Sequence, residues 1–200
     1  MSLLPWIIGA PLIGAGLLFA WREMPERLAA LVGVGSVTVA ALFTALVGQA
    51  FLADPQPVTD TLWVWFAVEV LQPAIALYLD GLSLTMLGVI TGVGALIHLY
   101  ASWYMRGDPG YRRFFAYMNL FVSAMLLLVL GDNLLSLYFG WEGVGLCSYL
   151  LIGFWSQQRD NGYAARKAFV TTRVGDTLMA IGLFLLFREV GTLQIQEAVA

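Results

Sequence analysis

The protein is a chain of 200 residues, of which 60% are hydrophobic and only 12% are charged. A soluble domain carries about a quarter charged residues, so this composition favours a membrane protein. Ten Lys and Arg against 13 Asp and Glu give a formal net charge of −3, which excludes a basic surface for nucleic acid. One cysteine and one histidine exclude an internal disulfide framework and a metal centre built on those residue types.

Apolar stretches long enough to cross a bilayer recur along the chain. The hydrocarbon layer is about 30 Å thick, which takes about 20 helical residues to cross. Because lipid offers backbone groups no hydrogen-bond partner, each stretch is expected to be helical. The first stretch lacks a basic leader and is too long for a signal peptide, so we interpret it as a span. The predicted spans cover residues 3–21, 28–52, 82–104, 114–131, 133–154 and 166–187.

The segment 61–80 is apolar enough to suggest a seventh span, and the placement of basic residues argues against it. Glu69 and Pro73 also interrupt it. We therefore predict an all-α, polytopic membrane helix bundle over residues 1–200, with about six transmembrane helices. Its N-terminus is external (periplasmic), and an external loop or short hairpin lies near 53–80. In this topology one side carries Arg22, Arg27, Arg106, Arg112, Arg113, Arg159, Arg166 and Lys167.

The stretch YFGWEGVGLCSYLLIGFW places Glu142 deep inside the predicted span 133–154. At about 1.5 Å per residue, some nine residues of helix bring this carboxylate near the middle of the membrane. Ionisable residues at such depth are rare and mark ion or proton paths. The alternative is a fixed ion pair that only joins two helices. We interpret Glu142 as the first candidate for proton translocation.

The predicted span 166–187 carries a second set of charges, in the stretch RKAFVTTRVGD. Arg173 and Asp176 are three residues apart, so they can meet on one helix face. Such a pair lowers the cost of burying both charges, which is a purely structural alternative. Together with Lys167, however, they step inward from the basic side toward Glu142. A proton relay needs such a series, and we predict that all four residues take part in translocation.

Other polar residues have weaker claims to function. His98 lies among apolar residues in the span 82–104 and is a candidate proton relay, since imidazole titrates near neutral pH; a packing role is the alternative. Asp80 and Asp132 stand at the ends of predicted spans, where acidic residues commonly cap helices. Glycines around Glu142 allow close helix packing or leave room for a neighbouring side chain. No cofactor-binding or metal-binding residue is predicted.

Three stretches together resemble one family. They are DGLSLTMLGVITGVGALIHLYASWYMRGDPGYRRFFAYMNLF, DNLLSLYFGWEGVGLCSYLLIGFW and KAFVTTRVGD. They are similar to chain L of NADH-quinone oxidoreductase (respiratory complex I), whose mitochondrial counterpart is NADH dehydrogenase subunit 5. The family is longer, so the chain resembles its N-terminal portion. The resemblance implies an antiporter-like, proton-translocating subunit in which Glu142 is central, Arg173 and Asp176 influence pumping, and a lysine beyond Ala200 pairs with Glu142.

The resemblance also implies the surroundings of the chain. Electrons pass from NADH to quinone in other subunits, which hold FMN and the iron–sulfur clusters, so no cofactor is expected here. A multi-pass protein of the inner (plasma) membrane is expected, in contact with other membrane subunits, lipid and protons. A subunit of a multi-subunit monovalent cation/proton antiporter is the alternative, because that family shares a Trp–Glu pair in the corresponding span. A passive bundle that only assembles other subunits is a third interpretation.

Overall fold

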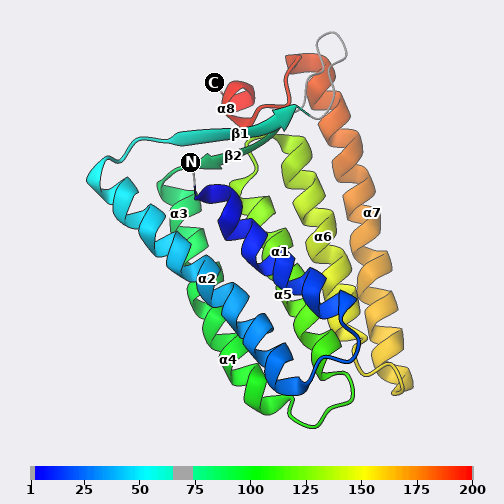
Figure 1. Ribbon diagram of the computed structural model, residues 1–200. Helices are drawn as coiled ribbons and strands as arrows, with labels where there is room; N and C mark the ends of the chain where they lie inside the picture. Colours follow the sequence, from blue (N-terminus) through cyan, green and yellow to red (C-terminus); the bar gives the residue numbers. More distant parts are fainter. Residues whose placement is uncertain (1–2, 65–73, 200) are drawn as a thin grey trace.

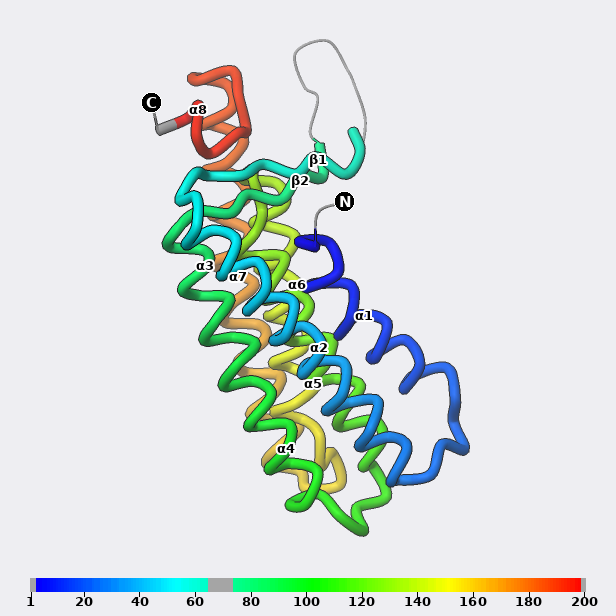
Figure 2. The backbone as a smooth tube through the Cα atoms, turned by 60° about the vertical axis from the view of Figure 1, so that its left-hand side comes forward, coloured from blue at the N-terminus to red at the C-terminus, as the bar shows by residue number. Residues whose placement is uncertain are grey.

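The computed structural model describes residues 3–64 and 74–199. In this part of the chain, long helices run back and forth as a bundle, and a two-stranded hairpin lies across one end (Figure 1). The first turn of the first helix and the last helix both lie near the hairpin (Figure 2). The helices are α1 Leu4–Ala20, α2 Glu26–Ala53, α3 Gly81–Gly88, α4 Gly94–Tyr104, α5 Tyr111–Leu130, α6 Leu134–Ile152, α7 Arg159–Val190 and α8 Ile195–Val199.

Helix α3 continues into α4 through η1, a π-helical turn over Val89–Val93, so the two form one long helical segment. Within the described residues, five helical segments are long and apolar enough to cross a membrane. The remaining long helix, α1, is apolar but has only 17 residues. The predicted fold class, an all-α bundle of about six long helices, is confirmed.

Helix α7 extends beyond the apolar stretch in its sequence. It begins at Arg159, well before residue 166, because the polar residues at its start continue the helix outside the apolar part. It ends at Val190, followed by Gly191 with φ +77°. This left-handed conformation suits glycine, and the Gly191 N–H donates to the Phe187 carbonyl at 2.8 Å. The resulting helix has 32 residues, against 19 in α6 (Leu134–Ile152).

The segment 61–80 belongs to a hairpin in its described parts. Strands β1 (Val58–Val64) and β2 (Ala74–Leu79) are antiparallel and join the bundle end through β2, where Leu77 is 1% exposed and forms a bridge with Gly131. The predicted hairpin is therefore confirmed. Glu69 and Pro73 lie outside the described residues.

The helix caps differ from expectation at one of two positions. Asp80 caps α3, since its Oδ1 accepts the Ser83 N–H at 2.8 Å and the Ser83 hydroxyl accepts the Asp80 N–H at 2.8 Å. At α6 the cap is Asn133, whose side-chain oxygen accepts the Ser136 N–H at 2.9 Å. The cap expected at Asp132 was wrong, because the next residue takes that role and Asp132 is left for other contacts.

A buried amide joins helices in the core. Asn119 on α5 is 0% exposed and donates to the carbonyls of Gly33 at 3.1 Å and of Phe115 at 2.9 Å. Its side-chain oxygen accepts the Ser36 hydroxyl from α2. Every polar atom of this amide therefore has a partner, which indicates a structural clamp between α2 and α5.

Candidate functional site

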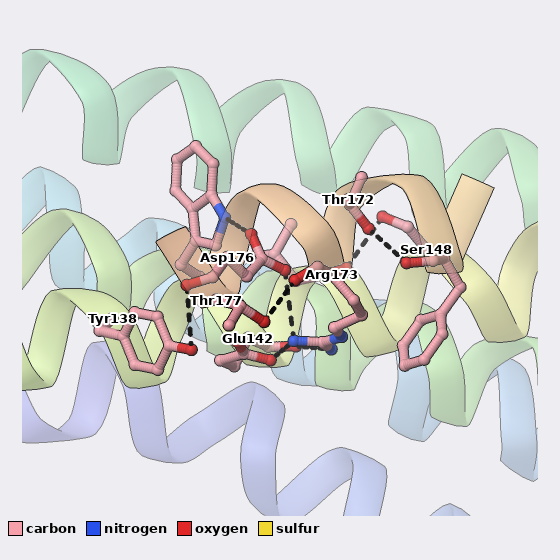
Figure 3. Close-up of polar contacts among 10 residues, drawn as sticks. Tyr138, Glu142, Ser148, Thr172, Arg173, Asp176 and Thr177 are labelled. Carbon is pink, nitrogen blue, oxygen red and sulfur yellow. Dashed lines mark hydrogen bonds and ion pairs between the residues drawn. The ribbon is translucent and has the colours of Figure 1, made fainter. Parts of the chain in front are cut away.

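Glu142 on α6 forms an ion pair with Arg173 on α7 (Figure 3). The Glu142 Oε2 and Arg173 Nη1 atoms make the contact, and the two side chains are 28% and 26% exposed. Helices α6 and α7 lie side by side in both overall views, so the pair joins two elements that are adjacent along their length (Figures 1 and 2). Within these 200 residues, Arg173 is therefore a cationic partner of Glu142, whereas the lysine beyond Ala200 that the resemblance implies stays a prediction.

Arg173 makes further contacts that fix its position. Its Nη2 donates to the main-chain carbonyl of Glu142 at 3.3 Å, and its Nη1 lies 3.4 Å from Asp176 Oδ2. Its guanidinium also lies over the Phe169 ring, 4.5 Å from the ring centre, which is a cation–π contact. The planar, forked guanidinium therefore reaches two carboxylates at once, which a lysine ammonium does less well.

Asp176 is the most buried member of the group, at 6% exposed. Its Oδ1 accepts the Trp141 indole N–H at 2.8 Å, and the Tyr138 hydroxyl donates to its main-chain carbonyl at 3.4 Å. Tyr138, Trp141 and Glu142 are spaced three and four residues apart on α6, so they share a helix face. Figure 3 shows Tyr138 and Glu142 on α6 pointing toward residues of α7.

Three glycines around Glu142 explain how α6 fits between its neighbours. A Cβ at Gly140 would lie 2.6 Å from the Leu128 backbone nitrogen, and one at Gly143 would lie 2.9 Å from the Ala124 Cβ. Both glycines therefore let α5 approach α6 closely. A Cβ at Gly145 would lie 3.5 Å from Arg173 Nη2, so this third glycine faces the guanidinium instead.

A cleft of about 360 Å³ lies beside the charged group, between α6 and α7 and against α5. Asp176 and Trp141 line one part, and Ser148 and Thr172 add hydroxyl groups to walls that are otherwise mainly apolar. Each hydroxyl donates back to its own helix, to Val144 at 2.9 Å and Phe169 at 2.9 Å respectively, which leaves its oxygen free to accept.

The structure separates the other predicted site residues from this group. Lys167 lies on α7 before Arg173, is exposed, and forms no ion pair among the described residues. His98 on α4 is 0% exposed, its Nδ1 is 2.8 Å from the Gly94 carbonyl, and its ring lies near Phe115. The roles of Lys167 and His98 in proton transfer stay predictions.

Sequence reasoning missed the residues that hold Asp176 and Arg173 in place. Trp141 and Tyr138 read as apolar membrane residues, although each has a polar group that acts here as a donor. Phe169 was likewise overlooked as a cation–π partner. The available signal was spacing, because Tyr138 and Trp141 precede Glu142 on the same helix face, and Phe169 precedes Arg173 by one turn.

Comparison with known proteins identifies the family. Residues 65–115 match the family described as NADH-ubiquinone oxidoreductase (complex I), chain 5 N-terminus. Residues 131–200, which carry Glu142, Arg173 and Asp176, match the family described as NADH:quinone oxidoreductase/Mrp antiporter, transmembrane. The chain is 60% identical to NADH-quinone oxidoreductase subunit L of Pseudomonas aeruginosa over 98% of its length. The chain belongs to the NADH-quinone oxidoreductase subunit L family.

Other members of the subunit L family agree. The chain is 57% identical over its whole length to subunit L of Escherichia coli K12, and 44% identical over 94% of its length to subunit L of Mycobacterium tuberculosis H37Rv. It spans about a third of the length of these relatives, at 33% and 30% respectively. The apolar helices and the family together make it a multi-pass membrane protein.

The fold is also found in a solved structure. The chain superposes on a chain of the membrane-bound sulfane sulfur reductase, an archaeal respiratory membrane complex, with a TM-score of 0.78. That match covers 96% of this chain and 29% of the other, at 19% sequence identity. At this identity the likeness shows the fold alone.

Proposed function

We propose that this chain is part of a membrane-arm subunit of NADH-quinone oxidoreductase that translocates protons. The observation that carries the proposal is the group formed by Glu142, Arg173 and Asp176 between α6 and α7. Charged groups within membrane helices are costly to maintain and mark ion pathways. Membership of the subunit L family supports the same activity, coupled to electron transfer from NADH to quinone.

The charges of the group favour the uptake of one proton. Two carboxylates and one guanidinium carry a net charge of −1 when both acids are ionised, and a negative charge in an apolar environment is costly. One added proton makes the group neutral. Arg173 then stays beside Asp176, whose Oδ2 lies 3.4 Å from its Nη1. Glu142 is the principal carrier in this scheme, and Arg173 and Asp176 set how readily it binds and releases the proton.

The remaining predicted residues extend the route. Lys167 lies on α7 toward the end of the bundle that carries most basic residues, and we place it at the entrance to the group. The family resemblance supplies a further partner, a lysine beyond Ala200 that pairs with Glu142. A second cation approaching the group would compensate its negative charge and favour proton release. We retain His98, which is buried on α4, as a candidate proton relay.

The redox chemistry is placed elsewhere in the complex. A chain with one cysteine lacks the thiolates that an iron–sulfur cluster needs, so we assign the clusters to other subunits. In line with the family resemblance, we assign FMN, NADH and quinone to other subunits as well. Those subunits and the surrounding lipid are the proposed partners, and the inner membrane is the proposed location. The basic residues at the α1–α2, α4–α5 and α6–α7 turns all lie at one end of the bundle, which supports an external N-terminus.

A multi-subunit cation/proton antiporter remains the alternative function, since one matched family includes both classes. The match of residues 65–115 to complex I chain 5, and the subunit L relatives, favour the oxidoreductase. Transport that depends on sodium and needs no NADH would favour the antiporter.

The test uses the full-length subunit in its assembled complex, in inverted membrane vesicles. Glu142→Gln removes the proton-binding carboxylate with little change in shape. We expect a clear fall in vesicle acidification per NADH oxidised, or a joint loss of both activities in assembled complex. Glu189→Gln is the matched control, because Glu189 is 69% exposed and pairs with Arg188 at the end of α7. Unchanged acidification per NADH in the Glu142 variant would contradict the proposal.

A further inference from the structure

Asp132 lies where three parts of the chain meet. Its backbone N–H donates to the Ala76 carbonyl in β2 at 3.2 Å, and its carbonyl accepts the Ile195 N–H at 3.2 Å. The Leu134 N–H also donates to the Leu193 carbonyl at 2.9 Å. The α5–α6 junction therefore holds both the hairpin and the segment after α7 through main-chain hydrogen bonds, and the Asp132 side chain is left without a capping role.

A polar cavity of about 480 Å³ opens between these parts. Two carboxylates line it, those of Asp132 and Glu197. Neutral oxygen-bearing side chains surround them, among them Thr59 and Thr61 on β1 and Gln194 before α8. The cavity lies at the hairpin end, whereas Glu142 lies within α6 and outside its lining. It is a site distinct from the α6–α7 ion pair.

Asp132 is a buried residue, and no basic side chain among the described residues compensates its charge. Asp132 is 9% exposed, and among the described residues no hydrogen bond or ion pair reaches its carboxylate. None of the described residues that line the cavity is basic. Burial raises the pKa of the Asp132 carboxyl, and the negative charge of Glu197 raises it further. Within the described part of the chain, the Glu197 carboxylate accepts one hydrogen bond, from the Thr192 hydroxyl at 2.6 Å.

We propose that this cavity binds a divalent cation between Asp132 and Glu197, with Ca²⁺ as the best fit. Hard divalent cations take oxygen ligands, and Ca²⁺ accepts six to eight of them in flexible geometry. The two carboxylates supply the charge, and the threonine hydroxyls and glutamine carbonyl supply neutral ligands. Such an ion would join the hairpin, the α5–α6 junction and the segment around α8, and so stabilise this end of the bundle.

The test measures Ca²⁺ binding to the assembled complex after treatment with a chelator, by equilibrium binding of ⁴⁵Ca²⁺. The wild type is compared with Asp132→Asn and Glu197→Gln, and Glu189→Gln serves as the control for a lost negative charge at the same end. We expect each cavity variant to bind one Ca²⁺ fewer per complex than the wild type and the control. A parallel titration with Mg²⁺ is expected to show weaker binding at this site.

Hydrogen–deuterium exchange gives a second reading that does not depend on counting ions. With free Ca²⁺ at 100 times its Kd, backbone amides of residues 193–197 should exchange up to about 100-fold more slowly in the wild type. The same addition should change little in Asp132→Asn or Glu197→Gln. Equal Ca²⁺ binding by the wild type and both cavity variants, with no Ca²⁺-dependent protection of residues 193–197, would overturn the proposal.

Discussion

Trp141 donates its indole N–H to the Asp176 carboxylate across 2.8 Å, and so joins α6 to α7 one residue before Glu142. Asp176 also contacts Arg173, which pairs with Glu142. The Trp141 indole is therefore linked to Glu142 through Asp176 and Arg173. The indole N–H can donate only to a carboxyl oxygen that does not itself carry a proton. In the proposed function, Trp141 is therefore a positioning residue for Asp176.

Trp141→Phe removes this donor and keeps most of the ring volume. A hydrogen bond to a charged group contributes about 1.5–3 kcal/mol, so the variant should weaken the α6–α7 contact by that order. We expect a lower ratio of protons pumped to NADH oxidised in assembled complex. Trp155→Phe is the control, since Trp155 donates to Asp108 at 2.9 Å away from the group. Equal pumping ratios in both variants would show that the indole contact is irrelevant to transport.

Arg173 and Glu142 should be energetically coupled. Breaking a fully buried ion pair costs about 3–5 kcal/mol, and the partial exposure of these side chains, 26% and 28%, reduces that cost. A double-mutant cycle of Arg173→Gln and Glu142→Gln should give an interaction energy of about 0.5–3 kcal/mol. Unfolding in a detergent titration supplies the four free energies. Additive effects would mean that the contact contributes nothing to stability.

Gly140→Ala should disturb the packing of α5 on α6. The added Cβ would lie 2.6 Å from a backbone atom of Leu128, which has no side-chain freedom to move away. We expect destabilisation of about 1–3 kcal/mol, measured by thermal unfolding and by the yield of assembled complex. Gly182→Ala on α7 is the control, because nothing lies within 4 Å of its added Cβ. A Gly140 variant as stable as the Gly182 variant would refute the close approach.

Asn119→Ala should affect stability and leave transport intact. The change removes the donors to Gly33 and Phe115 and the acceptor for Ser36, at a cost of about 1–3 kcal/mol. The pumping ratio per assembled complex should equal that of the wild type, because in the described structure no hydrogen bond or ion pair links the amide to Glu142. A reduced ratio at normal assembly would instead place Asn119 on a proton path. Asn161→Ala, at the start of α7 outside this core, is the control.

Much of the bundle follows from length and hydropathy. Long apolar stretches predicted helices where α2, α5 and α6 are found, and basic residues correctly argued against a seventh helix in the described parts of 61–80. The helix ends were harder to predict, because the polar first turns of α7 carry no apolar signal. Asp132 was misread as a cap because its neighbour Asn133 is equally suited, and only the tertiary contacts of the junction decide between them.

The spacing of Arg173 and Asp176 predicted that they would meet, and the structure confirms this contact. The position of Glu142 deep within its predicted span marked it as a candidate site residue. That Glu142 pairs with Arg173, however, depends on how α7 is rotated against α6. A single sequence does not specify this rotation, because the exposed face of α7 is apolar as well. The donors on Trp141 and Tyr138 were hidden for a similar reason, since hydropathy treats these side chains as uniform.

The central claim is that Glu142 itself binds and releases a proton, and infrared difference spectroscopy tests this most directly. The spectrum of assembled complex with NADH minus the spectrum without it should contain a change in the C=O stretch of a protonated carboxyl group. We predict that this band is lost in Glu142→Gln and kept in Glu189→Gln. A band that is unchanged in the Glu142 variant would mean that this carboxylate keeps its charge during turnover and serves only to pair with Arg173.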